Sequence, residues 1–164
     1  MRDSSVKRTR KTPSRRELIE RLSIAIRASQ NISDAFDEKV AERLGINRTD
    51  LRGLDILNQR GSMTAGQLAE AMHLTSGAIT TLLDRLEKAG YARRVRDTDD
   101  RRRILVELTP LAEDAASLYD PLFHGSVELL KERTDRELQV MIDFLERGHE
   151  MVELELEKLE REEK

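Results

Sequence analysis

The sequence predicts a mainly α-helical protein that carries one small β-hairpin. Aromatic residues make up 3% and charged residues 37% of the 164 residues, which is typical of long helices and not of a compact α/β enzyme. Apolar residues recur at helical spacing over most of the chain, and only residues 91–109 change to the alternating pattern of strands. A chain of this length can form one domain with a real core, or a core with extended helices.

The formal net charge of −3 hides an uneven distribution of charged residues. Residues 1–16 hold seven Lys or Arg and one acid, and residues 85–103 hold eight Lys or Arg against four acids. Residues 150–164 are instead acidic, with seven Glu against three Lys or Arg. Local basic patches can attract a nucleic acid even when the whole chain is slightly acidic.

The composition also bears on location and redox chemistry. The chain has no cysteine, which excludes disulfides and a thiol-based switch. No apolar run approaches the roughly 20 residues of a membrane helix, and the basic N-terminus lacks the apolar stretch of a signal peptide. We therefore expect a cytoplasmic protein with no membrane partner.

The N-terminal part is predicted to be a basic arm followed by one long helix. Residues 1–13 are rich in Arg, Lys, Ser and Thr, so we expect a flexible arm that adds contacts to DNA or simply aids solubility. Residues 14–46 then show helical periodicity. Ser14 and Glu17 have the spacing of a capping box, and Gly45 can end the helix.

A second helix is predicted over residues 49–59, and a pair of short helices follows it. Thr64 and Gln67 have the spacing of another capping box at the first short helix, and residues 73–75 make a short turn before the second. The second short helix places its apolar residues at positions i, i+3, i+4 and i+7, namely Ile79, Leu82, Leu83 and Leu86. Two short helices joined by such a turn form a helix-turn-helix.

The helix pair is followed by a predicted hairpin. Residues 91–96 and 103–109 have the pattern of two strands, and the segment between them is highly charged. A helix-turn-helix followed by a hairpin is a winged helix-turn-helix, which we assign to residues 47–109. In this arrangement the second helix of the pair enters a major groove of DNA.

The C-terminal segment, residues 110–164, is predicted to form two helices. Pro110 can begin the first, which continues to Leu130, and the second begins near Thr134. The second helix carries apolar residues alternately four and three positions apart, with one histidine among them: Leu138, Ile142, Leu145, His149, Val152, Leu156 and Leu159. Such a seam is typical of a coiled coil and favours dimerisation, although packing within one chain would give the same pattern.

The second helix of the pair carries the candidate residues for reading DNA. Its outward face presents small and hydroxyl-bearing side chains and an arginine, which can contact base edges or phosphates. We predict major-groove contacts from Ser76, Gly77, Thr80, Thr81 and Arg85, and contacts with the DNA backbone from Thr64, Thr75 and Lys88. The alternative is an ordinary solvated helix face.

The charged tip of the hairpin is the second candidate site. An arginine at such a tip can enter a minor groove, where the negative potential of DNA is deepest. Asp100 and Arg102 lie two residues apart, so on one side of an extended strand the carboxylate can hold the guanidinium in a bidentate pair. We predict that Arg102, aimed by Asp100, enters the minor groove, and that Arg94, Arg96 and Arg101 add charge. The alternative is a charged turn that keeps the sheet edge soluble.

The stretch LTSGAITTLLDRLEKAGYARRVRDTDDRRRILVELT resembles the core of the MarR family of winged-helix transcriptional regulators. Its distinctive pieces are LLDRLEKAG in the recognition helix and the wing pattern formed by Asp100, Arg102, Val106, Leu108 and Thr109. The resemblance covers roughly residues 45–110. Directly after it, residues 110–112 are Pro-Leu-Ala where the family often has a charged residue and Gly, so this junction departs from the family's pattern.

The resemblance implies a homodimer in which the first helix and the last two helices intertwine. It implies a pseudo-palindromic operator in double-stranded DNA, with recognition helices in successive major grooves and wings in the flanking minor grooves. Family members commonly repress genes and are released by a small, often aromatic, ligand. The candidate lining of such a pocket, equally interpretable as ordinary core, is Ile24, Ala28, Ile32, Phe36, Leu54, Leu118 and Leu122.

We expect no enzymatic activity, because the sequence shows no nucleophile–base set, phosphate loop or metal motif. Three scattered histidines do not form a metal-binding pattern, so we expect no metal site and no cofactor. Two alternative functions remain. The chain could be a protein–protein adaptor built on a winged helix, or an architectural DNA-binding protein that responds to no ligand.

Overall fold

The computed structural model describes residues 12–162 of the chain. The predicted basic arm therefore lies largely outside the described residues. The chain divides into two compact units, Met1–Ala115 and Ala116–Lys164. The division falls at the end of the first helix of the segment that we assigned to dimerisation, before its last residue, Ala116.

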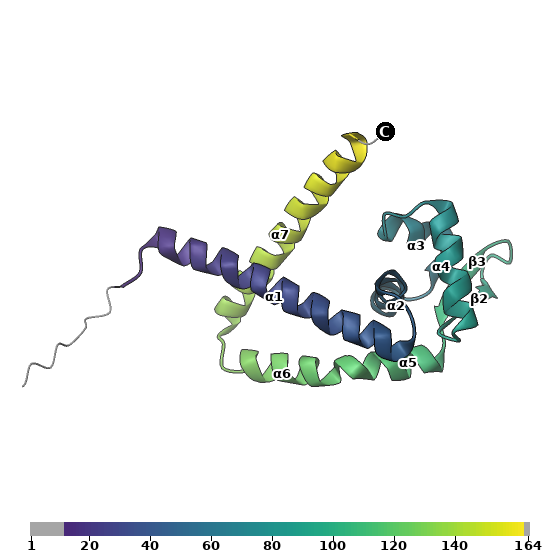
Figure 1. Ribbon diagram of the computed structural model, residues 1–164, viewed down its shortest axis with the longest axis horizontal. Coiled ribbons are helices and arrows are strands. Elements are labelled where there is room, and N and C mark those ends of the chain that lie inside the picture. The colour runs from purple at the N-terminus through teal and green to yellow at the C-terminus, as the bar shows by residue number, and fades with distance from the viewer. Residues whose placement is uncertain (1–11, 163–164) are drawn as a thin grey trace, which may run out of the picture. The chain divides into compact units, whose positions relative to one another are not determined.

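The first unit begins with the long helix α1 (Arg15–Leu44) and continues with α2 (Arg48–Arg60) (Figure 1). The predicted capping box of α1 is present, since Glu17 N–H donates to the Ser14 hydroxyl and Ser14 N–H donates to the Glu17 carboxylate. Gly45 ends α1 with a φ of 69°, the left-handed conformation that glycine adopts without strain. Both helices lie within one or two residues of their predicted ranges.

The helix-turn-helix consists of α3 (Ala65–Ala71) and α4 (Ser76–Lys88). Thr64 and Gln67 form the predicted capping box of α3, and Thr75 caps α4 by accepting a hydrogen bond from Ala78 N–H. The turn between the helices contains His73 with a φ of 53°, which is uncommon for a residue other than glycine. These local signals fix the start of each helix as the sequence predicts.

A three-stranded antiparallel sheet completes this lobe, with the strand order β1-β3-β2. The hairpin strands are β2 (Ala92–Arg96) and β3 (Ile104–Leu108), which match the predicted wing. The two-residue strand β1 (Met63–Thr64) was not predicted, and it pairs with β3 through Met63 and Val106. Through β1, the entry to α3 is tied to the base of the wing.

The core of the first unit lies among α2, α3, α4 and the sheet. Its most deeply buried side chains include Leu68, Leu86 and Val106, all exposed by 1% or less. The short helix α5 (Pro110–Ala116), which begins at Pro110 as predicted, contributes the buried Ala112. Packing therefore assigns α5 to the winged-helix lobe, although the sequence placed it with the dimerisation helices.

The second unit contains a single turn of 3₁₀-helix (Ser117–Tyr119), then α6 (Asp120–Leu130) and α7 (Asp135–Glu162). The prediction of one continuous helix from Pro110 to Leu130 was wrong. Pro121 has no backbone N–H to donate to the carbonyl of Ser117, and its ring would clash with that carbonyl in a continuous α-helix. The 3₁₀ turn begins at Ser117, where this break is expected.

The helices α6 and α7 contain no buried residue within the described chain. Their exposed apolar residues include those of the predicted seam, such as Ile142, Leu145 and Val152. Among residues 12–162, no helix is long and apolar enough to cross a membrane.

Candidate nucleic-acid interface

The recognition helix α4 separates a buried apolar face from an exposed polar one. Its four predicted core residues are all at most 2% exposed: Ile79, Leu82, Leu83 and Leu86. The opposite face carries the predicted major-groove residues, all exposed: Ser76, Gly77, Thr80, Thr81 and Arg85. No side chain would crowd a Cβ at Gly77, so this end of the helix is open to a close approach.

The two threonine hydroxyls of this face are already engaged as donors. Thr80 donates to the Ser76 carbonyl at 2.9 Å, and Thr81 donates to the Gly77 carbonyl at 3.0 Å. In this rotamer their oxygens can still accept hydrogen bonds, for example from the amino groups of adenine or cytosine. A contact with a phosphate would require these hydroxyls to turn, because a phosphate only accepts.

Arg85, for which we predicted a major-groove contact, does not extend freely from α4. Its Nε lies 2.9 Å from Asp50 Oδ2, and its Nη2 lies 2.5 Å from Asp50 Oδ1. This bidentate ion pair joins α4 to α2, and the hydrogen bonds to Asp50 raise the pKa of Arg85. Two of its three guanidinium nitrogens are thus hydrogen-bonded within the protein.

Asp50 itself was missed by our reading of the sequence. It is the only buried charged residue between residues 12 and 162, with an exposure of 1%. A signal was present, since Asp50 lies at i, i+4 and i+7 with the buried Leu54 and Leu57 and so falls on the apolar face of α2. A carboxylate on such a face requires a partner, which Arg85 provides.

Arg94 also differs from its predicted role as a wing cation. Its guanidinium pairs with Asp84 at 2.9 Å and with Glu87 of α4, while its backbone N–H donates to Glu87 at 2.9 Å. These contacts brace β2 against the recognition helix. They also leave two carboxylates of α4 paired with a cation of the wing.

The wing tip is organised by Asp97, a residue that we had not singled out. Its Oδ1 accepts hydrogen bonds from Asp99 N–H at 2.9 Å and Asp100 N–H at 3.5 Å. Its other carboxylate oxygen lies 3.8 Å from Arg103. An aspartate that binds backbone N–H groups two or three residues later is a common turn-forming device. The opposite charges at this tip therefore build a turn.

The predicted bidentate pair between Asp100 and Arg102 is not formed. Residues 97–103 are a turn and not an extended strand, so the two side chains do not share one side of a strand. The Asp100 carboxylate instead accepts the Arg102 backbone N–H at 3.1 Å, and it lies 3.8 Å from Arg102 Nε. The Arg102 side chain is 96% exposed, so Asp100 shapes the turn that presents Arg102 without gripping its guanidinium.

The wing nevertheless presents a group of exposed cations. Arg96 and Arg101 are exposed like Arg102, and neither forms an ion pair with any residue between 12 and 162. Lys88, in the last turn of α4, is exposed as well. Of the other two predicted backbone contacts, Thr64 and Thr75 use their hydroxyls for helix capping. The local charge at the wing is thus positive despite the acidic total.

The predicted pocket residues do not share one environment. Leu54 lies in the hydrophobic core with an exposure of 6%, the environment that the alternative interpretation describes. Ile24 and Ile32 are about 70% exposed on α1, Ala28 is exposed and Phe36 is half-buried. In the second unit, Leu118 is half-buried and Leu122 is 50% exposed.

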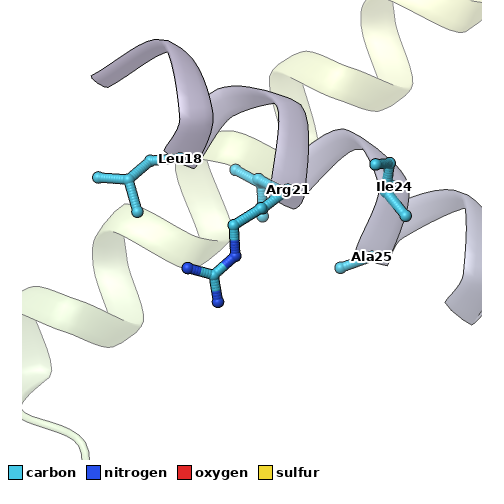
Figure 2. Close-up of a pocket in the computed structure, with 5 residues that line it drawn as sticks. Leu18, Arg21, Ile24 and Ala25 are labelled. Atoms are coloured by element: carbon cyan, nitrogen blue, oxygen red, sulfur yellow. The ribbon is translucent and has the colours of Figure 1, made fainter. Parts of the chain in front are cut away.

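A shallow hollow does occur along α1. It is lined by Leu18, Arg21, Leu22, Ile24 and Ala25. Figure 2 shows Arg21 between the apolar side chains of this stretch of the helix. Only Ile24 belongs to both this hollow and the predicted pocket.

Comparison with known proteins identifies the family. The sequence profile of the MarR family matches residues 46–104. The HTH-type transcriptional regulator YcgE of Bacillus subtilis is 41% identical over 127 residues, which are 77% of this chain and 82% of that protein. The chain belongs to the MarR family. A second B. subtilis regulator, YfiV, is 30% identical over 66% of this chain and 70% of its own length.

Solved structures show the same fold. A MarR family protein from Bacillus stearothermophilus superposes with a TM-score of 0.61 and 21% identity, over 86% of this chain and 99% of that one. A mutant of S. aureus MepR bound to an oligodeoxyribonucleotide gives a TM-score of 0.54 and 21% identity, over 80% of this chain and 97% of that one. The profile match spans α2 to the beginning of β3, which is the lobe that holds the candidate interface.

Proposed function

We propose that this MarR family regulator is a homodimer that binds a pseudo-palindromic DNA operator and represses transcription until a small ligand releases it. The observation that carries the DNA-binding part is the pairing of two exposed features in one lobe. The α4 face offers small and hydroxyl-bearing side chains, and the adjacent wing offers the exposed cations Arg96, Arg101 and Arg102. The DNA-bound MepR structure, which shares this fold, supports the assignment.

The geometry suggests different roles for the α4 face and the wing. With its apolar face anchored in the core, α4 can place Ser76, Gly77, Thr80 and Thr81 in a major groove. The wing cations suit a minor groove or the adjacent phosphates, since arginine is drawn to the strong negative potential there. Affinity then depends mainly on the wing and the phosphates, whereas sequence preference depends on α4.

The exposed apolar surface of α7 supports the homodimer. Its seam repeats over three heptads, and its members Ile142, Leu145 and Val152 are 46–66% exposed in the single chain. A seam of this kind is stable in water only when a partner covers it. A second copy of the chain is the partner that the family supports, and two-fold symmetry then matches a pseudo-palindromic operator.

The proposed ligand is a small aromatic molecule. A family resemblance supports a small aromatic effector, and the apolar hollow on α1 with its single Arg21 would suit an aromatic acid. No other cofactor is proposed. An effector that acts in this way must bind the DNA-free state more tightly than the DNA-bound state.

The test is binding of the purified full chain to the DNA immediately upstream of its own gene, measured by fluorescence anisotropy. The titration is repeated over a range of salt concentrations, and a scrambled duplex is the control. We expect tighter binding to the native duplex and a steep loss of affinity with salt. Equal affinity for both duplexes would favour an architectural DNA-binding protein. An absence of binding at low salt would favour the protein–protein adaptor.

A further inference from the structure

The ion pair between Asp50 and Arg85 joins a buried carboxylate of α2 to the exposed face of the recognition helix. The Asp50 side chain is 2% exposed, whereas the Arg85 side chain is 43% exposed. A buried carboxylate is strongly destabilising without a partner, because it has lost its hydration. Asp50 therefore holds Arg85 in place much more firmly than a surface acid would.

The position of the pair allows it to set the orientation of α4. Asp50 lies in the first turn of α2, where the helix dipole favours an anion, and Arg85 lies in the last turn of α4, where the dipole favours a cation. One turn away, the same two helices approach closely, since a Cβ on Gly53 would lie 3.3 Å from Leu82 Cδ2. The ion pair and this close contact together oppose rotation of α4 about its axis.

We infer that Arg85 is a positioning residue, which acts through Asp50 to fix the rotation of α4 on α2 and so determines how the helix's hydroxyl-bearing face meets the bases. The inference rests on the proposed DNA-binding function, and it assigns Arg85 a different role from the base contact that the sequence predicts. The bidentate geometry supports it, because one carboxylate holds Nη2 and Nε at 2.5 and 2.9 Å, which fixes the guanidinium against α2 and leaves only Nη1 and the second hydrogen of Nη2 for any other partner.

Three roles for Arg85 make different predictions about DNA binding. A base-reading arginine confers preference at one base pair, so its loss relaxes the sequence preference at that position alone. A phosphate-binding arginine contributes to the salt dependence, so its loss lowers the salt slope by about one. A positioning residue affects every base under α4 together and leaves the salt slope unchanged. If Arg85 only positions the helix, then loss of Asp50, which touches no DNA, must reduce the sequence preference as much as loss of Arg85 does.

The experiment begins with selection of a preferred duplex from a random library by the wild-type protein. Affinities for that duplex, for its single-base variants and for a scrambled duplex are then measured over a salt series. The variants are Arg85→Gln, Arg85→Lys, Asp50→Asn and the double variant Asp50→Asn/Arg85→Gln. Arg60→Gln, which removes an exposed arginine from the end of α2, is the matched control for loss of charge.

We expect Arg85→Gln and Asp50→Asn each to reduce the ratio of specific to scrambled affinity by roughly tenfold, and the double variant to lose no more than either. The loss should be shared among the contacted base pairs, with an unchanged salt slope. Arg85→Lys should reduce the ratio almost as much as Arg85→Gln, since lysine keeps the charge but lacks the planar guanidinium that pairs with both carboxylate oxygens. Arg60→Gln should leave the ratio unchanged.

Thermal unfolding of each variant separates positioning from loss of fold. If the single variants unfold, the double variant carries the test, because it leaves no unpaired charge buried beside Gly53 and Leu82. Relaxed preference at one base pair in Arg85→Gln but not in Asp50→Asn would overturn the inference, as would a lower salt slope. A wild-type protein that enriches no duplex would overturn the proposed function, and the inference with it.

Discussion

The leucines of the winged-helix lobe and those of α7 lie in opposite environments, although both sets recur at helical spacing. Leu82 and Leu86 of α4 are 1% and 0% exposed, because α2, α3 and the sheet cover them. Leu145 and Leu154 of α7 are 66% and 57% exposed. The lobe therefore buries its own apolar residues, whereas α7 presents an apolar surface that is stable only against a partner.

This contrast predicts that substitutions in the two regions separate dimerisation from DNA contact. The largest effect is expected from Leu145→Glu in the seam of α7. Burying a glutamate in the interface of two identical copies should cost about 3–5 kcal/mol of dimer stability. The dimer dissociation constant should then rise by about a hundredfold or more. Sedimentation velocity over a series of protein concentrations measures it.

Leu154→Glu is the matched control for this substitution. Leu154 follows Leu145 by nine residues, about two and a half helical turns, so it lies on the opposite side of α7. It has a similar exposure and the same side chain, and it should leave the dimer largely intact. Equal weakening by both substitutions would mean that the heptad seam does not form the interface.

A smaller effect is expected when the wing loses Arg102. Because its side chain is 96% exposed, Arg102→Ala should leave folding and dimerisation unchanged. If Arg102 makes a good contact in the groove, its loss should weaken operator binding by about 1–3 kcal/mol. Anisotropy titrations measure this loss, and Arg147→Ala on α7 controls for the removal of one exposed arginine. A loss of only a few tenths of a kcal/mol would refute the wing contact.

Substitution of Arg94 tests the charge arrangement of the lobe, because Arg94 is expected to affect operator binding indirectly, through its ion pairs. Arg94→Ala removes the cation that pairs with Asp84 and Glu87, so two carboxylates of α4 would face the DNA unpaired. We expect operator binding to weaken by about 1 kcal/mol, the size of a unit-charge interaction across water. Adding Asp84→Asn and Glu87→Gln should restore most of the affinity. If affinity stays low in that triple variant, Arg94 contacts DNA directly.

The elements of the lobe were largely predictable from the sequence, because local signals determine where they begin and end. Capping boxes at Ser14 and Thr64 and the left-handed Gly45 mark helix ends through contacts between near neighbours. The two-residue strand β1 is too short for any periodicity to indicate it. The break before α6 was predictable, since Pro121 has no N–H for the Ser117 carbonyl and disfavours a continuous helix at this point.

The side-chain partners in the site were not predictable in the same way. Exposure of Arg85 and Arg94 follows from helix and strand spacing, but their partners do not. Asp50 is 35 residues from Arg85, and Asp84 is 10 residues from Arg94 on a different element. Such pairs depend on how α2, α4 and β2 pack, which periodicity alone does not specify. Sequence patterns thus located the interface, and packing determined which of its arginines remain available.

The smallest effect concerns a feature that the two regions share, the carboxylate cap at the start of a long helix. Glu137 accepts hydrogen bonds from Thr134 N–H at 2.8 Å and from its hydroxyl at 2.9 Å, and Glu17 accepts one from Ser14 N–H at 2.6 Å. The backbone hydrogen bond from Thr134, followed by the hydroxyl, lowers the pKa of Glu137, and the backbone and hydroxyl of Ser14 lower the pKa of Glu17 in the same way.

A depressed pKa means that the folded chain holds these protons less tightly than the unfolded chain does. The stabilisation is therefore present above the ordinary glutamate pKa of about 4.3, and it is lost as the pH falls through the lower pKa of the folded state. Glu137→Gln and Glu17→Gln should each lower Tm slightly at pH 7, and the difference from wild type should shrink as the pH falls below about 4.3, as measured by circular dichroism. A difference from wild type that does not shrink as the pH is lowered would show that the glutamate acts by packing and not by its charge. Similar profiles for both variants would show that capping depends on the first turn alone, whichever unit contains the helix.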